Sequence, residues 1–223
     1  MAAPMLPPPL TEQAEEIDRV WDVFLIGAIA VFAFVAILVI FIVVRFRRRD
    51  DRLPRQVRLN LPFELSYTFI PLLVVGALFA ITFISVRDVD AEVDPDELDL
   101  TVGVVGFRWQ WRFEYPDHGV IVSGSEQQIP ELVLPASSTV RFEVMSVDVI
   151  HSFWIPGFRF KRDLFPEAES TVDVEMTDTT GSWPAGGICA EFCGLDHHKM
   201  YFDVRVVTPE EFDQWIAEQG GTP

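Results

Sequence analysis

The sequence predicts a membrane-anchored all-β protein in which a hairpin of two transmembrane helices precedes a β-sandwich or barrel. Two long apolar runs near the N-terminus predict the helices, and segments of alternating apolar and polar residues after position 98 predict the strands. The charges are also unevenly spread, since arginines gather between the two runs and carboxylates dominate the remainder. The chain therefore divides into a membrane portion and a water-exposed portion, with the boundary near residue 87.

The two apolar runs cover residues 23–44 and 65–86, and neither contains a charged side chain. A helix of this length, at about 1.5 Å per residue, spans the roughly 30 Å of hydrocarbon in a bilayer. We therefore expect a transmembrane hairpin over residues 23–86. A buried helix of a soluble protein rarely runs so far without a polar face. A cleaved signal peptide is disfavoured because acidic residues, not basic ones, precede the first run.

The segment between the runs predicts the orientation of the hairpin. Residues 45–58 carry seven arginines against two aspartates, and loops on the cytoplasmic side are enriched in such residues. The loop at 45–64 is therefore expected in the cytoplasm, with both termini on the extracytoplasmic side of the plasma (inner) membrane. On this interpretation residues 1–22 form an outer N-terminal segment, and the proline-rich stretch at 1–10 is an extended, flexible lead-in.

An acidic linker is predicted at residues 87–98, followed by a separate domain at residues 99–223. From position 88 onward, 26 aspartates and glutamates stand against eight lysines and arginines. Such a charge would repel the phosphates of nucleic acid, so no nucleic-acid partner is expected, and it favours attraction of a basic protein. Solubility alone is the simpler explanation for many of these carboxylates.

Three segments of this domain alternate as half-buried strands do: residues 140–145, 171–176 and 201–206. In the first, three apolar side chains fall on one face, and Arg141 and Glu143 fall on the other. Helical patterns do not separate these segments, which favours a β-sandwich or barrel.

One helix is expected at the C-terminal end of the domain. Thr208 is suited to the N-cap, Pro209 to the first helical position and Glu211 to the reciprocal contact of a capping box. Gly220 and Gly221 then end the helix.

Soft metal ligands are concentrated in the stretch "ICAEFCGLDHHKM" at residues 188–200. It contains both cysteines of the chain, two of its four histidines and one methionine. The candidate ligands in it are Cys189, Cys193, His197 and Met200. A further candidate, His151, lies at the end of an upstream strand. A β-sandwich can gather ligands in this way from a loop and a distant strand end.

Three kinds of chemistry fit these residues. A disulfide between Cys189 and Cys193 would explain neither histidine nor Met200. A zinc site would use both cysteines with His151 and His197, but it has no use for the thioether. Thiolate, imidazole and thioether together are the ligands of copper electron-transfer sites. A mononuclear copper site needs only one thiolate, so the second cysteine favours two copper ions bridged by two sulfurs.

The ligand pattern, with Glu191 between the two cysteines, resembles the dinuclear copper site, CuA, of cytochrome c oxidase subunit II. The resemblance covers nearly the whole chain: two helices, then a domain that the family builds as a cupredoxin-like Greek-key β-sandwich. It implies a respiratory oxidase subunit that accepts electrons from cytochrome c. The electrons would pass to the haem-copper site of subunit I, where O2 is reduced to water with coupled proton pumping.

The roles of the ligands follow from the same resemblance. Cys189 and Cys193 would bridge the two copper ions, and His151 and His197 would each bind one of them. Met200 would be a weak ligand of one copper.

Glu191 would bind the other copper through its backbone carbonyl, and its side chain would reach a magnesium ion shared with subunit I. Haem would be held only by the partner subunit. His198 stands one residue off the pattern, and His118 lies in a turn, so both are interpreted as histidines outside the ligand set.

Three further residues match family positions. Trp109, in "GFRWQWRFEYP", resembles the residue at which electrons enter from cytochrome c, although Phe107 stands where the family commonly has histidine; Trp111 and Phe113 are interpreted as core aromatics. Asp148 resembles an acidic docking position for cytochrome c. Glu64, in "FELSYTFIP", resembles a glutamate at the mouth of a proton channel of subunit I; an interfacial carboxylate without a special role is the alternative.

The implied partners are subunits I and III of the oxidase, membrane lipid, and a soluble or membrane-held cytochrome c. Two other functions remain open: the CuA subunit of a nitric oxide reductase, and a copper chaperone of the Sco type. The chaperone is disfavoured because it has one membrane anchor and a thioredoxin-like fold. A quinol oxidase subunit II is disfavoured because it lacks the copper cysteines. The segments at 160–163 and 189–194 look more like actinobacterial than mitochondrial subunits.

Overall fold

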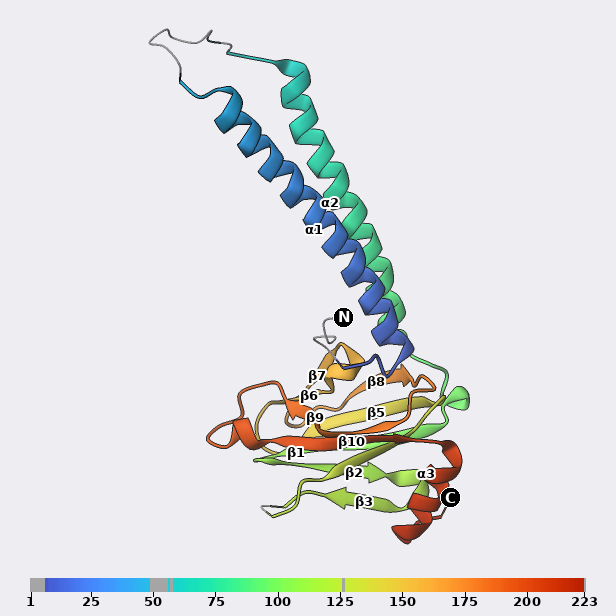
Figure 1. Cartoon of the computed structure of the whole chain (residues 1–223). Coiled ribbons are helices and arrows are strands. Elements are labelled where there is room, and N and C mark those ends of the chain that lie inside the picture. The colour runs from blue at the N-terminus through green and yellow to red at the C-terminus, as the bar shows by residue number, and fades with distance from the viewer. Residues whose placement is uncertain (1–6, 49–55, 57, 126, 223) are drawn as a thin grey trace. The chain divides into compact units, whose positions relative to one another are not determined.

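The computed structural model describes residues 7–48, 56, 58–125 and 127–222. The chain forms two compact units. One consists of Asp18–Arg87, and the other of Met1–Ile17 together with Asp88–Pro223 (Figure 1). The first is called the helical unit and the second the β unit.

The helical unit contains most of α1 (Glu12–Arg45) and α2 (Leu61–Val89). Both are long and apolar enough to cross a membrane. Each extends beyond the apolar run that predicted it, because the helix continues through polar residues at its ends. The expected loop at 45–64 is shorter in consequence, and its residues 49–55 and 57 lie outside the described part of the chain.

Of the flexible lead-in predicted at residues 1–10, residues 1–6 lie outside the described part of the chain, and the segment that follows them is bonded to the β unit. Leu10 is buried, its amide donates to the carbonyl of Gly157, and its carbonyl accepts from the amide of Thr177. Thr11 forms a bridge with Met176. Residues 7–11 are therefore fixed on the β unit, because one buried side chain and paired backbone groups outweigh the solubility of the prolines.

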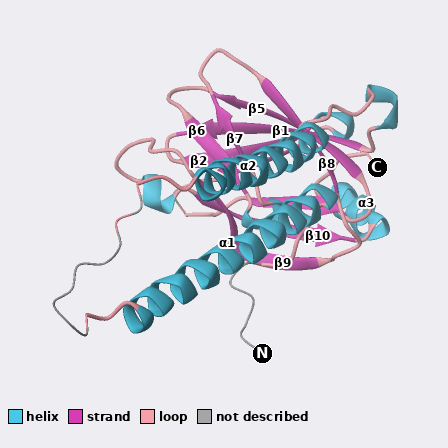
Figure 2. Cartoon of the chain, turned by 90° about the horizontal axis from the view of Figure 1, so that it is seen from above, coloured by secondary structure: helices cyan, strands magenta, loops and turns pink. Residues whose placement is uncertain are grey.

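The β unit contains two five-stranded sheets. The first has the order β3 (Val120–Ser123), β2 (Gln110–Tyr115), β1 (Leu100–Phe107), β5 (Thr139–Ser146), β8 (Ser170–Glu175). The second has the order β4 (Glu131–Pro135), β10 (Tyr201–Val207), β9 (Gly181–Cys189), β6 (His151–Trp154), β7 (Lys161–Leu164). The pairs β1–β5 and β4–β10 are parallel, and the other pairs are antiparallel. Figure 2 shows β9 and β10 side by side.

The three strands with clear alternation are confirmed as β5, β8 and β10. In β5, Val140, Phe142 and Val144 are fully buried, as the period of two requires. A short 3-10 helix, η1 (Pro95–Glu97), precedes β1. Three more lie in connections between strands, namely η2 (Pro116–His118), η3 (Pro156–Phe158) and η4 (His197–Lys199).

The core between the sheets is rich in aromatic rings. Trp111 and Phe113 of β2 are fully buried, which confirms them as core residues. The rings of Phe153 and Phe202 stack with their centroids 5.3 Å apart. Phe153 lies opposite Cys189 in the β6–β9 pair, and Phe202 is near the start of β10. The segment between Cys189 and Tyr201, called the ligand loop below, therefore adjoins a packed aromatic core.

Tyr115 links β2 of the first sheet to β4 of the second. Its hydroxyl donates to the carbonyl of Val133 at 2.9 Å and accepts from the amide of the same residue at 3.0 Å. Burial raises the pKa of Tyr115 well above its ordinary value, so the hydroxyl keeps its proton. The hydroxyl thus satisfies two buried backbone groups at once.

The chain ends in α3 (Pro209–Glu218), and the predicted capping box is confirmed. The Glu211 amide donates to the Thr208 hydroxyl, and the Thr208 amide donates to the Glu211 carboxylate. The buried face of the helix carries Phe212 and Trp215, whose rings contact Tyr115.

Candidate metal centre

Two strands bring the ligand loop to the upstream histidine. The loop joins β9, which ends at Cys189, to β10, and the Cys189 amide donates to the Met200 carbonyl at its base. Strand β6 begins at His151 and pairs with β9 so that Phe153 lies opposite Cys189. This pairing places residue 151 beside the loop, although 38 positions separate it from residue 189.

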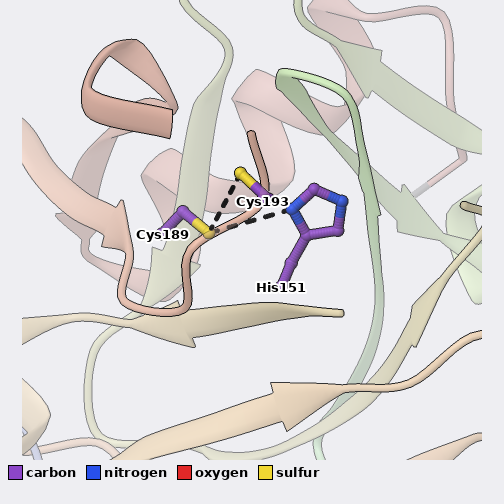
Figure 3. A group of neighbouring side chains, drawn as sticks. All are labelled: His151, Cys189 and Cys193. Atoms are coloured by element: carbon purple, nitrogen blue, oxygen red, sulfur yellow. Dashed lines mark hydrogen bonds between the residues drawn. The ribbon is translucent and has the colours of Figure 1, made fainter. Parts of the chain in front are cut away.

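The two thiols and the His151 ring point toward one another (Figure 3). The Cys189 Sγ lies 3.9 Å from the Cys193 Sγ and 3.8 Å from the His151 Nδ1. Both cysteines are free and buried. Their separation is nearly twice the roughly 2.05 Å of an S–S bond, so this arrangement is not a disulfide. His151, Cys189 and Cys193 form a group that could hold a metal ion.

The other predicted ligands lie around the same sulfurs. The Cys193 Sγ is 3.6 Å from the His197 Nδ1 and 3.7 Å from the Met200 Sδ. The Cys189 Sγ is 3.2 Å from the carbonyl oxygen of Glu191.

These spacings match those between ligands of a metal ion. An ion bonded tetrahedrally to sulfur at about 2.3 Å and to nitrogen at about 2.0 Å separates its ligands by about 3.5–3.8 Å. Both imidazoles face the sulfurs with Nδ1, and a buried thioether is directed at one of the thiols. This donor set fits copper better than zinc because of the thioether.

The protonation of the thiols depends on their neighbours. Burial opposes ionisation of Cys189, but hydrogen bonds from His151 and from the Ser152 backbone outweigh it and lower the pKa of Cys189 to about 7. Burial and the charge of Cys189 raise the pKa of Cys193 to about 12. Burial likewise opposes protonation of His151, but hydrogen bonds with Cys189 and Asp148 raise the pKa of its imidazole. A bound cation would therefore displace protons from this group.

Asp148 orients the His151 ring. Its Oδ1 lies 2.9 Å from the His151 Nε2, and its Oδ2 accepts from the backbone amide and the guanidinium of Arg108 at 2.8 and 3.3 Å. Burial opposes ionisation of Asp148, but these bonds and the Val149 amide lower its pKa to about 2. The carboxylate therefore keeps Nδ1 of His151 turned toward the sulfurs, as partners of metal-bound histidines commonly do.

Arg108 is a contributor that the sequence reasoning missed. It lies in the turn between β1 and β2, forty positions before Asp148. Nothing in its local sequence signals this contact. The carboxylate of Asp148 is 21% exposed and bonded within the chain, whereas the sequence resemblance assigned it to docking.

Trp109 contacts the ligand loop at Cys193 and Gly194. Its indole nitrogen donates to the carbonyl of Cys193 at 3.3 Å. Gly194 adopts a φ of +123°, and a Cβ there would lie 3.3 Å from the indole nitrogen. A glycine at this position therefore lets the indole lie directly on the loop.

The remaining residues named from the sequence are His198, His118 and Glu64. His198 is exposed, and the Nδ1 of His118 lies 2.7 Å from the carbonyl oxygen of Thr222. Glu64 belongs to the helical unit, where its carboxylate accepts from the Asn60 amide at 3.4 Å.

The loop also presents an apolar rim. Phe192 is 76% exposed and Leu195 is 82% exposed. A hollow beside them has a volume of about 710 Å³ and is lined by Val149, Ile150, Phe165, Pro166 and residues 191–194.

Fold and site together define a membrane-anchored β-sandwich protein with a buried group of two thiols and an imidazole that could hold a metal ion. Residues 3–87 match the family model described as the transmembrane domain of cytochrome c oxidase subunit II, and residues 123–207 match its periplasmic domain. The chain belongs to the cytochrome c oxidase subunit II family.

Two curated relatives support this membership across nearly the full chain, and one solved structure is reported beside them for comparison. A probable cytochrome c oxidase subunit 2 of Nocardia farcinica is 31% identical, over 96% of this chain and 73% of the relative. One from Rickettsia bellii is 33% identical, over 95% of this chain and 82% of the relative. The periplasmic domain of subunit II from Bradyrhizobium japonicum is 31% identical, with a TM-score of 0.48 over 55% of this chain and 94% of that one.

The family assigns the β unit to the cupredoxin-like class and makes the chain a membrane-anchored subunit of an oxidoreductase. The predicted fold class is therefore confirmed. The two other functions, a nitric oxide reductase subunit and a copper chaperone, gain no support from these matches.

Proposed function

We propose that this chain takes electrons from cytochrome c at a dinuclear copper centre and passes them to the haem-copper site of subunit I. There O2 is reduced to water, with coupled proton pumping. One observation carries this proposal: two free thiols lie 3.9 Å apart, and four further donor groups lie within 3.2–3.8 Å of one thiol or the other. Two copper ions bridged by two thiolates supply a site that stores one electron.

The donor groups would be held by the chain in the arrangement described above. Cys189 and Cys193 would bridge, His151 and His197 would each bind through Nδ1, and Met200 would be a weak ligand. The backbone carbonyl of Glu191 would complete the set. Because both cysteines belong to the packed core, the donor atoms have little room to move when the charge of the site changes.

Trp109 is the proposed point at which electrons enter. Its partly buried indole is hydrogen-bonded to the backbone of the bridging Cys193, so it connects the surface with the site. The formal net charge of −17 would attract a basic cytochrome at low ionic strength. Asp148 would contribute to this field while it holds His151.

The remaining roles concern partner subunits. The side chain of Glu191 would bind a magnesium ion shared with subunit I, and Glu64 would lie near the mouth of a proton channel of that subunit. Subunit I would hold the haem, and subunit III would complete the core complex. The positive charge of residues 45–58 supports a cytoplasmic loop in the plasma membrane, with both termini extracytoplasmic.

The proposal is tested by serine substitutions in the assembled oxidase. Cys189→Ser and Cys193→Ser should each abolish the mixed-valence copper signal in electron paramagnetic resonance and stop oxidation of cytochrome c. His198→Asn is the matched control, because this exposed neighbour stands outside the donor set. Full copper content and turnover in either serine variant would contradict the bridging role, and a single zinc ion in the unmodified protein would contradict the function.

A further inference from the structure

Two segments join the β-sandwich to the helices, and both are fastened to strand β8. The first segment precedes and begins α1, and the second follows α2. Strand β8 is the edge strand of the first sheet. The chain therefore contacts β8 or the residues after it twice, once before it enters α1 and once after it leaves α2.

The first segment binds the C-terminal end of β8 and the residues after it. The Thr177 amide donates to the Leu10 carbonyl at 3.0 Å, and Thr11 bridges to Met176. The side-chain oxygen of Gln13 accepts from the Glu175 amide at 3.0 Å. These contacts extend the edge of the sheet by a short added stretch of chain.

The second segment is held by an ion pair with a buried carboxylate and a partly buried guanidinium. Arg141 of β5 and Asp173 of β8 form two hydrogen bonds, at 2.7 and 2.6 Å, and the Asp173 carboxylate is 1% exposed. The same pair satisfies both backbone groups of Val93, because its amide donates to Asp173 and its carbonyl accepts from Arg141, each at 2.8 Å. Nearby, Arg162 pairs with Asp90 at 3.0 Å.

Removing the charges of an ion pair from water costs free energy, so well-packed apolar residues often stabilise a strand equally well. Burial opposes ionisation of Asp173, but the hydrogen bond from Arg141 holds its pKa below the ordinary value. The pair therefore stays charged at neutral pH and gives Val93 one defined position. Fixing the position of Val93 is therefore the best physical reason for a charged contact at this place.

We propose that Arg141 and Asp173 are positioning residues for the passage of electrons out of this subunit: they fix the segment that links α2 to the sandwich. This inference rests on the proposed function. The rate of electron transfer to a haem in another subunit falls steeply as the distance between donor and acceptor grows. Greater freedom of movement in the connecting segments should therefore slow this transfer. Receipt of electrons at Trp109 does not depend on these segments.

The test compares three variants of the full chain in the assembled oxidase. Asp173→Asn removes the ion pair with little change of volume. Insertion of Gly-Ser between Ala91 and Glu92 lengthens the segment and leaves the pair intact, so it remains informative if Asp173→Asn does not fold. Glu131→Gln is the matched control, because Glu131 forms a similar two-bond pair with Arg205 on the other sheet, with bonds of 3.1 and 3.0 Å.

Rapid-mixing spectroscopy separates reduction of the copper site by cytochrome c from its reoxidation by the haem. Asp173→Asn and the insertion should each slow reoxidation by about tenfold, since ångström-scale misplacement of reacting groups costs up to a hundredfold. The copper signal, its reduction rate and both rates in Glu131→Gln should stay as in the unmodified oxidase.

Unchanged reoxidation in the insertion variant overturns the positioning role, as does an equal loss in Glu131→Gln. The positioning role is also overturned if Asp173→Asn loses the copper signal and both rates together while the insertion variant behaves as the unmodified oxidase. That result would leave Asp173 a purely structural role. An absent copper signal in the unmodified oxidase would instead contradict the proposed function itself, so the two failures are distinguishable.

Discussion

The Tyr115 hydroxyl joins the two sheets, and its removal should destabilise the sandwich. Tyr115→Phe keeps the ring and therefore its contacts with Phe212 and Trp215, whose centroids lie 6.1 and 5.1 Å away. Only the two hydrogen bonds to Val133 are lost. The substitution thus isolates the polar contact from the packing.

The loss of stability follows from the amide and carbonyl of Val133, which the substitution leaves without their partner. Val133 is fully buried, so neither its amide nor its carbonyl gains water as a replacement partner. An unsatisfied buried group costs about 1–3 kcal/mol. Allowing for partial relaxation, the free energy of unfolding of the β unit should fall by about 2–4 kcal/mol.

Native-state hydrogen exchange of the full chain in detergent measures this change. Amides of β4 and β10 that exchange through opening of the sandwich should exchange about thirtyfold to several hundredfold faster in Tyr115→Phe. Tyr201→Phe, which removes the hydroxyl of a half-buried residue at the start of β10, should change them little and serves as the control. Equal exchange in the Tyr115 variant and the control would refute the reasoning.

Three further predictions concern packing, acid and electron transfer. Gly187→Ala would place a Cβ 2.0 Å from the Phe202 ring, so it should lower the thermal midpoint, whereas Gly27→Ala, with open space around it, should not. The folded-state pKa of Asp173 is lowered, so its contribution to stability is present above about pH 4 and is lost as the pH falls through the folded pKa. The stability of Asp173→Asn should therefore depend less on pH in acid. An acid-unfolding profile equal to that of the unmodified protein would contradict this. Trp109→Phe removes the bond to the ligand loop and should slow oxidation of cytochrome c in rapid mixing without loss of copper; an unchanged rate would remove this indole from the route.

Local patterns in the sequence predicted the elements that have strong periodicity. Helices α1 and α2 follow from uncharged runs, and β5, β8 and β10 follow from strict alternation. Strands β6 and β7 have four residues each, too few for a pattern to stand out. Helix ends were misplaced because apolar content marks the membrane span and not the last hydrogen-bonded turn.

The donor set divides in the same way. Five of its six members lie between positions 189 and 200, so their spacing alone drew attention to them, and their role as copper ligands stays a prediction. The link between His151 and the loop depends on the register of β6 against β9. Local sequence patterns do not predict which strands pair when they are far apart along the chain. The same holds for Arg108 with Asp148 and for Arg141 with Asp173, which unite residues 40 and 32 positions apart.

The placement of most donors in one strand connection has an evolutionary consequence. Insertions, deletions or replacements between β9 and β10 can change which metal the protein binds, or whether it binds one, while the registers of both sheets stay intact. The scaffold and its chemistry can therefore diverge independently, and a relative that had lost its redox role could keep the same membrane anchor and sandwich.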